Sequence, residues 1–327
     1  MIEFSIAFQT DKRLSEYGSL AELVEQQGFD AISVYNDLFF QPAWLPLMEI
    51  ARHTRQIQLG VAAVNPFTCH PINIAGNIAL IDGASNGRAY LGLARGAWLD
   101  ALDIYPTKPI TAIREAITLV RKLVAGDDAG FTGEIFSLVA GQTLRWSLYR
   151  DAIPILLGTW GEQLIARTAD LIDLVKVGGS ANPPMARWTR ERIDRHANGR
   201  AIGLVVGAVT VVDADRAIAV NLARREVAMY LAVVAALDPT FVIDPDELAR
   251  VQSAVAIGDH AQAAHAISDA TLMRFAFCGT PSDIVNQARD LADAGATRIE
   301  FGTPHGVDRA NAIRLLGERV VPEFRSL

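Results

Sequence analysis

Two carboxylates and several other polar residues end or follow short apolar stretches of this chain. Asp37 and Glu300 could exchange a proton with a ligand if burial raised their pKa. Asp37 could instead cap the next helix, and the two carboxylates could pair with cations inside the protein. The other members of the set could bind polar or anionic atoms of a ligand: Gln9, Asn65, Arg95, Lys176 and Arg298. Among these, Lys176 and Arg298 are the cations that could pair with the carboxylates.

Glycine-rich turns occur at similar places in the chain. The stretch QLGVAAVNPF from Gln58 and the stretch SNGRAYLGLARG up to Gly96 both end in turns that let a backbone approach a flat, anionic cofactor. Gly178-Gly179-Ser180 is a short backbone nest of the kind that binds phosphate. Three tryptophans that could stack on a ring system or fill the core also follow strand ends: Trp44, Trp98 and Trp160. A cofactor enzyme is the leading hypothesis.

Short β-like runs alternate with amphipathic helical runs, which predicts a parallel α/β sheet with right-handed crossovers. Eight strands favour a closed (β/α)8 TIM barrel, and no GxGxxG follows the first strand to suggest an open dinucleotide-binding sheet. Because side chains alternate along a strand, inward residues near the carboxyl ends should form the site. The predicted strands are Phe4–Thr10, Ala31–Asn36, Gln58–Asn65, Ala89–Ala94, Ile153–Gly158, Leu174–Gly178, Ile202–Val212 and Arg298–Phe301.

The length of 327 residues fits one barrel domain, residues 1–327, with a helical insertion near 236–271 between strands seven and eight. A formal net charge of −7 argues against a nucleic acid or an anionic membrane surface as a partner. The longest apolar run, Val227 to Leu237, is too short to cross a membrane. We therefore expect a small-molecule substrate.

Cysteine and histidine usage bounds the chemistry further. The two cysteines, Cys69 and Cys278, fit a reducing compartment, and no secretion signal precedes the first strand, so we expect a cytoplasmic location. Neither cysteine lies in a cluster with metal-ligand spacing, and the six histidines form no HxxxH or HExxH pattern. A metal site is not expected.

Taken together, the segments resemble the luciferase-like flavin and deazaflavin barrel family. The matching segments include GFDAISVYND, QLGVAAVNPF with the following His-Pro, SNGRAYLGL, FCGTPSDI and AGATRIEFGTP, in order over nearly the whole chain. The segments TKPITAIREAI and FCGTP are most similar to the coenzyme F420-dependent methylenetetrahydromethanopterin reductases. The resemblance implies a TIM barrel, an F420 or alternatively an FMN cofactor, and a homodimer.

The resemblance also implies site residues. The family's bulge behind the cofactor ring, with its non-proline cis peptide, corresponds to Ala62-Ala63, and Asp37 corresponds to the first residue of an Asp-His pair. From their places at the strand ends, not from the resemblance, Gln9, Trp44 and Trp98 are expected on the substrate side, and Asp37 or Glu300 is the inward acid that could donate a proton. The expected cofactor-binding residues are Asp37, Ala62, Ala63, Asn65, Gly92, Arg95, Gly96, Gly158, Thr159, Gly161, Lys176, Gly178, Gly179 and Ser180.

Several positions depart from the family pattern. Leu38 replaces the histidine of the Asp-His pair, Ala7 and Ala97 replace acidic residues, and Arg95 replaces a small residue or proline. These changes affect the substrate side of the site. The sequence therefore supports the assignment of the cofactor better than the assignment of the substrate. The leading hypothesis is an F420-dependent oxidoreductase that transfers a hydride between a deazaflavin and an organic substrate, with a methylene-tetrahydropterin as the candidate substrate. The alternatives are an FMN-dependent monooxygenase and a non-catalytic cofactor-binding barrel.

Overall fold

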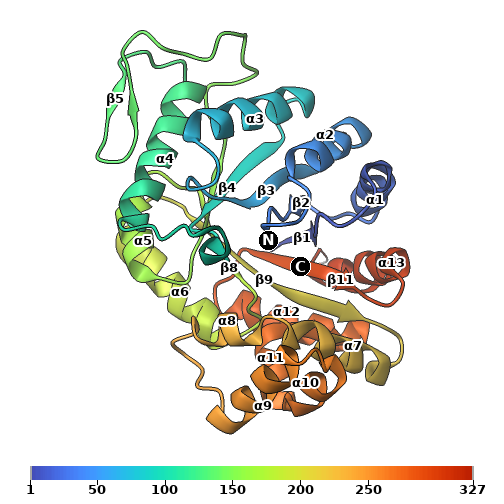
Figure 1. The fold of residues 1–327 in the computed structure, drawn as a ribbon. Helices are drawn as coiled ribbons and strands as arrows, with labels where there is room; N and C mark the ends of the chain where they lie inside the picture. Colours follow the sequence, from blue (N-terminus) through green and yellow to red (C-terminus); the bar gives the residue numbers. More distant parts are fainter. Residues whose placement is uncertain (1, 326–327) are drawn as a thin grey trace.

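A computed structural model describes residues 2–325 as a closed barrel of eight parallel strands surrounded by helices (Figure 1). The barrel strands pair in chain order, and the circle closes where β9 pairs with both β8 and β11. All eight predicted strands are present, so the predicted barrel is confirmed. The barrel strands are β1 Glu3–Phe8, β2 Ala31–Val34, β3 Gln58–Val64, β4 Ala89–Ala94, β7 Ile155–Gly158, β8 Leu174–Gly178, β9 Gly203–Val212 and β11 Arg298–His305.

The helices that follow the strands pack apolar faces against the outside of the barrel and form one large core with it. Their ends carry the signals expected from the sequence. For example, Thr280 and Asp283 form a capping box at the start of α12, and Gly295 follows its end with a positive φ of 98°. The covering helices are α1 Leu14–Gln26, α2 Trp44–His53, α3 Pro71–Ala84, α4 Pro109–Val124, α5 Glu162–Thr168, α6 Pro183–His196, α12 Pro281–Asp293 and α13 Arg309–Arg319.

The connection between β9 and β11 is larger than a single crossover. It holds five further helices around a second apolar core, which lies on one side of the barrel (Figure 1). This insertion extends beyond the predicted range of 236–271, and a ninth parallel strand that the sequence analysis missed, β10 Ala276–Gly279, pairs with the end of β9. The helices are α7 Arg216–Ala228, α8 Leu231–Ala235, α9 Pro245–Ala256, α10 His260–Ala266 and α11 Asp269–Phe275.

Three small elements complete the described chain. The 3-10 helix η1 (Leu99–Leu102) follows β4, and η2 (Val321–Phe324) follows α13. A hairpin of β5 (Phe131–Thr132) and β6 (Ser137–Leu138) projects from the barrel (Figure 1). The buried carboxylate of Glu115 accepts hydrogen bonds from three backbone N–H groups of this hairpin and so fixes it to α4. No helix in residues 2–325 is long and apolar enough to cross a membrane.

Candidate active site at the carboxyl end of the barrel

Gln9 and Asp37 meet where β1 and β2 end. Gln9 Nε2 donates a hydrogen bond to Asp37 Oδ2 at 2.8 Å, and Gln9 Oε1 accepts one from the backbone N–H of Thr10 at 2.8 Å. The second bond fixes the orientation of the amide, so its NH2 group points to the carboxylate. Burial raises the pKa of Asp37, while the Gln9 hydrogen bond and the charge of Lys176 oppose this shift. Asp37 can therefore hold a proton above the usual carboxyl range.

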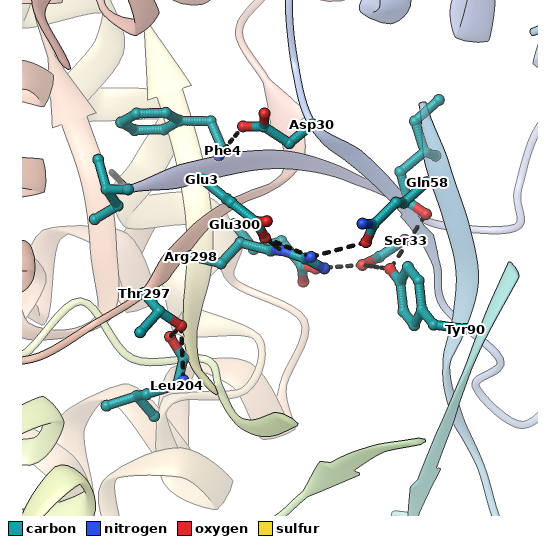
Figure 2. A network of polar contacts seen from close by, with 12 residues as sticks. Glu3, Phe4, Asp30, Ser33, Gln58, Tyr90, Leu204, Thr297, Arg298 and Glu300 are labelled. Atoms are coloured by element: carbon teal, nitrogen blue, oxygen red, sulfur yellow. Dashed lines mark hydrogen bonds and ion pairs between the residues drawn. The ribbon is translucent and has the colours of Figure 1, made fainter. Parts of the chain in front are cut away.

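The second carboxylate, Glu300, lies deeper in the barrel. Its two oxygens bind Lys176 Nζ and Ser33 Oγ, and Ser33 also shares a hydrogen bond of 2.6 Å with the Tyr90 hydroxyl; Figure 2 draws Glu300, Ser33 and Tyr90. Only 1% of Glu300 is exposed. Both carboxylate oxygens are thus used inside the protein. The expectation that Glu300 donates a proton to a ligand is corrected, because a deeply buried ion pair holds it.

Arg298 lies at the opposite, amino end of the barrel. Its guanidinium binds the carboxylate of Glu3, with Nη2 2.6 Å from Oε2, and donates to Gln58 Oε1 at 3.0 Å (Figure 2). It also lies over the ring of Tyr90, 5.7 Å from the centroid. Arg298 begins β11, so this cluster seals the amino end of the barrel rather than lining the site. Arg298 is thus held in an ion pair, but with Glu3 and not with Asp37 or Glu300 as considered from the sequence.

Small, partly exposed residues lie where β3, β4, β7 and β8 end. Ala62 and Ala63 are half-buried although the strand before them is buried, and Ala94, Gly158 and Gly178 are also half-buried. The peptide bond between Ala62 and Ala63 is cis, as expected, and the register with β4 shifts there. We call Ala62, Ala63, Ala94, Gly158 and Gly178 the platform, because such side chains leave room for a flat ring.

The same bulge explains why position 92 is a glycine. A Cβ on Gly92 would lie 2.3 Å from the backbone oxygen of Val61, so only glycine lets β4 approach β3 here. Asn65 Oδ1 accepts hydrogen bonds from the N–H groups of Phe67 (3.0 Å) and Thr68 (2.9 Å) and thus holds the turn after β3. Gly96, with φ at 84°, packs against the Asn65 amide. These residues shape the wall of the site.

The loop after β8 differs from the predicted phosphate nest. The N–H groups of Gly179 and Ser180 both donate to the Gly207 carbonyl, at 2.6 and 3.0 Å. The next N–H groups, of Ala181 and Asn182, donate to Arg274 O and Ser180 Oγ. These donors are therefore not free to bind a phosphate, and the nest prediction is corrected. The loop instead anchors the insertion, because the buried Asn182 side chain binds residues of both loop α8–α9 and α11.

The remaining predicted residues divide between core and surface. Trp44, at the start of α2, is half-buried and packs against the main core. Trp98 is 47% exposed beside β4 and has a positive φ of 55°. Arg95 is exposed and has no partner in residues 2–325. Thr159 Oγ1 accepts a hydrogen bond from Gly161 N at 3.1 Å, which orders the turn before α5.

One residue of the site was missed by the sequence analysis. Tyr35 directly follows β2, and Lys176 Nζ lies 5.1 Å from the centroid of its ring. Strand alternation was the signal that could have found it, because Ser33, Tyr35 and Asp37 are spaced by two. The barrel mouth thus combines a proton-holding carboxyl, a tyrosine and a platform of small residues, an arrangement that suits hydride and proton transfer on a ring-bound ligand.

Comparison with known proteins agrees with this arrangement. A model of the luciferase-like monooxygenase family matches residues 2–298. The chain is 29% identical to 5,10-methylenetetrahydromethanopterin reductase of Archaeoglobus fulgidus, over 99% of this chain and all of that protein. It is 27% identical to the enzyme of the same name from Methanolobus tindarius, over 97% of this chain and 99% of that protein.

A solved structure has the same fold. The coenzyme F420-dependent tetrahydromethanopterin reductase of Methanopyrus kandleri superposes with a TM-score of 0.90 at 24% identity, and the match covers 99% of both chains. The likeness extends through the insertion as well as the barrel, since almost no residue of either chain falls outside the match.

Proposed function

The chain belongs to the luciferase-like monooxygenase family, and on that premise we propose that it is a coenzyme F420-dependent oxidoreductase that transfers a hydride to or from an organic substrate. The observation that carries the proposal is the match to two methylenetetrahydromethanopterin reductases along essentially their whole length. A methylene-tetrahydropterin is accordingly the first substrate to test. The second candidate, an FMN-dependent monooxygenase, is favoured by the name of the wider family.

The platform fits the proposed cofactor. Its five members carry no side chain larger than methyl, and they come from four adjacent strands, so a planar deazaflavin ring can lie against them without a clash. Gly92, Asn65 and Gly96 form the adjoining wall, and Arg95 offers a free cation to the anionic part of the cofactor. Bound there, the cofactor would supply the hydride.

The protein contributes placement and a proton. Asp37 is the carboxyl at the mouth whose pKa is raised, so it can protonate the substrate heteroatom when the neighbouring carbon receives a hydride. Gln9 holds the resulting carboxylate through its 2.8 Å hydrogen bond. Ala7 and Ala97 offer no acid, and the carboxylate of Glu300 is already bound to Lys176. Asp37 is therefore the proton donor in this proposal.

The proposal includes a homodimer that forms through α3. This helix buries Ile74, Ala75, Ile78 and Ala79 against the protein, yet two further large apolar side chains, Ile72 and Leu80, are 39% and 53% exposed. The two residues are eight positions apart and share one face with Gly76, beside which the ring of Trp146 packs. We call Ile72, Gly76, Leu80 and Trp146 the α3 face, and a second copy of the chain is its proposed occupant. The free thiols of Cys69 and Cys278 support the proposed cytoplasmic location.

Binding experiments test the cofactor directly. Titration of F420 with the protein should quench deazaflavin fluorescence at micromolar concentrations, whereas FMN should bind much more weakly. Arg95→Gln should lower F420 affinity and flatten its salt dependence, because a cation is lost. Arg250→Gln, on the exposed outer surface of α9, is the matched control and should bind F420 as the unmodified protein does. FMN binding equal to or tighter than F420 binding would reject the proposal.

A further inference from the structure

Tyr35 lies on the same strand face as the proposed proton donor. Its backbone N–H donates to Phe8 O at 2.9 Å, so the chain continues beside β1 past the last residue of β2. Ser33, which faces the barrel interior through its bond to Glu300, is two residues before it, and Asp37 is two residues after it. Side chains at this spacing share a face of an extended chain. Tyr35 therefore lies between the buried ion pair and the mouth.

Tyr35 has two close neighbours, one at its ring and one at its hydroxyl. Lys176 Nζ lies 5.1 Å from the ring centroid, and this ammonium is fixed in turn by Glu300. At the hydroxyl, a Cβ on Gly302 would lie only 2.9 Å from the Tyr35 oxygen. The absence of a side chain at Gly302 thus leaves the space that the hydroxyl occupies. The position of the phenol is determined by its neighbours rather than by a hydrogen bond of its own.

The hydroxyl itself is unused inside the protein. No residue in 2–325 binds it, and it is not among the buried polar atoms that lack a partner, so it reaches solvent. Burial raises the pKa of Tyr35 well above its usual value, and the negative charges of Glu300 and Asp37 add to this shift. The ionisable side chains facing it are Lys176, Glu300, Asp37, Tyr90 and Tyr230. The phenol thus stays protonated and can donate a hydrogen bond to a ligand.

We propose that the Tyr35 hydroxyl is a further substrate-contacting group, which donates a hydrogen bond to the nitrogen or oxygen attached to the carbon that exchanges the hydride. This inference rests on the proposed function. Two donors would then converge on one heteroatom, Tyr35 as a fixed hydrogen-bond donor and Asp37 as the acid. The substrate class follows: a compound whose reacting carbon carries a hydrogen-bond-accepting heteroatom, such as an iminium, a cyclic aminal or a carbonyl.

The proposed step balances for a methylene group bridging two nitrogens. A hydride from the reduced deazaflavin forms a new C–H bond at the methylene carbon, and one C–N bond breaks with its electron pair going to nitrogen. That nitrogen takes the proton of the Asp37 carboxyl, which becomes a carboxylate bound to Gln9. The two electrons that reduce the methylene carbon to methyl would come from the reduced cofactor, which would be left oxidised. Tyr35 keeps its proton and stabilises the charge that develops on nitrogen.

Tyr35→Phe tests the inference, since it removes only the hydroxyl and no hydrogen bond within the protein. With reduced F420 and methylene-tetrahydromethanopterin, kcat/KM should fall by roughly 100-fold, as for loss of one transition-state donor. F420 binding, the melting temperature and the pH at which activity declines should stay unchanged. Tyr149→Phe is the matched control, because Tyr149 is exposed and packs against Gly87, before the amino end of β4.

The outcomes separate this inference from the function on which it rests. If the unmodified protein neither binds F420 nor oxidises reduced F420 with any substrate, the proposed function is wrong and the inference falls with it. If the unmodified protein turns over and Tyr35→Phe retains kcat/KM within about threefold, only the inference is overturned. An equal loss in Tyr149→Phe would also overturn it, because the effect would then not be specific to the mouth.

Discussion

The side-chain amide of Gln9 donates a hydrogen bond of 2.8 Å to Asp37 Oδ2 and so joins the ends of β1 and β2 at the barrel mouth. The bond favours the ionised carboxyl, whereas burial favours the neutral one, and burial has the larger effect on the pKa. Asp37 therefore holds a proton above the usual carboxyl range and has a partner for the carboxylate that remains after the proton leaves. Two residues from neighbouring strands form the acid of the proposed reaction.

Replacing this acid should remove most of the activity. Asp37→Asn keeps the size and the contact with Gln9 but carries no transferable proton, so kcat should fall by about 100-fold or more. F420 affinity, measured by fluorescence quenching, should change little if the carboxyl acts on the substrate. Retention of full kcat by Asp37→Asn would show that another group supplies the proton.

The pH dependence follows from the direction of the Asp37 shift. The acid must be protonated to act, so the rate should be highest below its pKa and fall as pH rises through it. Because that pKa is raised, the decline should occur above the ordinary aspartate value of about 4. A pH profile of kcat/KM measures this decline, and its absence in Asp37→Asn is the control.

The hydrogen bond from Gln9 should affect the pH at which the rate declines. Its hydrogen bond lowers the pKa of Asp37, so Gln9→Leu should raise this pKa and move the decline in rate to higher pH. A variant with a purely structural defect would lose activity at every pH without moving the profile. An unmoved or downward-shifted profile would contradict the role assigned to Gln9.

The effects on stability of replacing Lys176 and Glu300 should depend on each other, because the two side chains form a buried ion pair. Lys176→Met alone leaves the carboxylate of Glu300 buried without its cation and should lower the free energy of unfolding by about 3–5 kcal/mol. The double variant Lys176→Met with Glu300→Gln should recover most of that loss, because no unpaired charge remains. Urea unfolding of Lys176→Met, Glu300→Gln, the double variant and the parent protein gives the coupling energy, and additive effects would contradict it.

If two copies of the chain meet at the α3 face, a single charged substitution there should disrupt the dimer. Leu80→Glu should convert the protein to a monomer in light scattering, since a carboxylate would be buried at an apolar contact. Leu237→Glu, at a 45% exposed position in the insertion, is the control and should leave the mass unchanged. A parent protein that is monomeric at micromolar concentrations would reject the dimer.

Strand alternation made much of the barrel predictable. Each strand carries a short apolar run, and strand alternation predicted Gln9 inside the barrel near the mouth and Asp37 at the end of the second strand. Their hydrogen bond to each other was not predicted. The small residues Ala62 and Ala63 were likewise expected at a bulge, and the shifted register with β4 is present. These features depend on local sequence, so a single chain suffices to predict them.

The partners of those residues could not be predicted from local sequence. Glu300 binds Lys176 from a strand 124 positions away, so its ion pair depends on the closure of the barrel. The N–H groups of Gly179 and Ser180 are taken by the Gly207 carbonyl, a neighbour that only the pairing of β8 with β9 brings near. The local sequence does not distinguish Tyr35 from an ordinary strand residue, because its neighbours Gly302 and Lys176 come from distant strands.

Anaerobic oxidation of reduced F420, followed by absorbance, is the most direct test of the central claim. With methylene-tetrahydromethanopterin as the acceptor, the protein should oxidise one reduced F420 per substrate reduced, without requiring oxygen. Asp37→Asn under the same conditions should be slower by about 100-fold. Two results together would contradict the account: turnover that requires oxygen and reduced FMN, and no oxidation of reduced F420 when oxygen is absent.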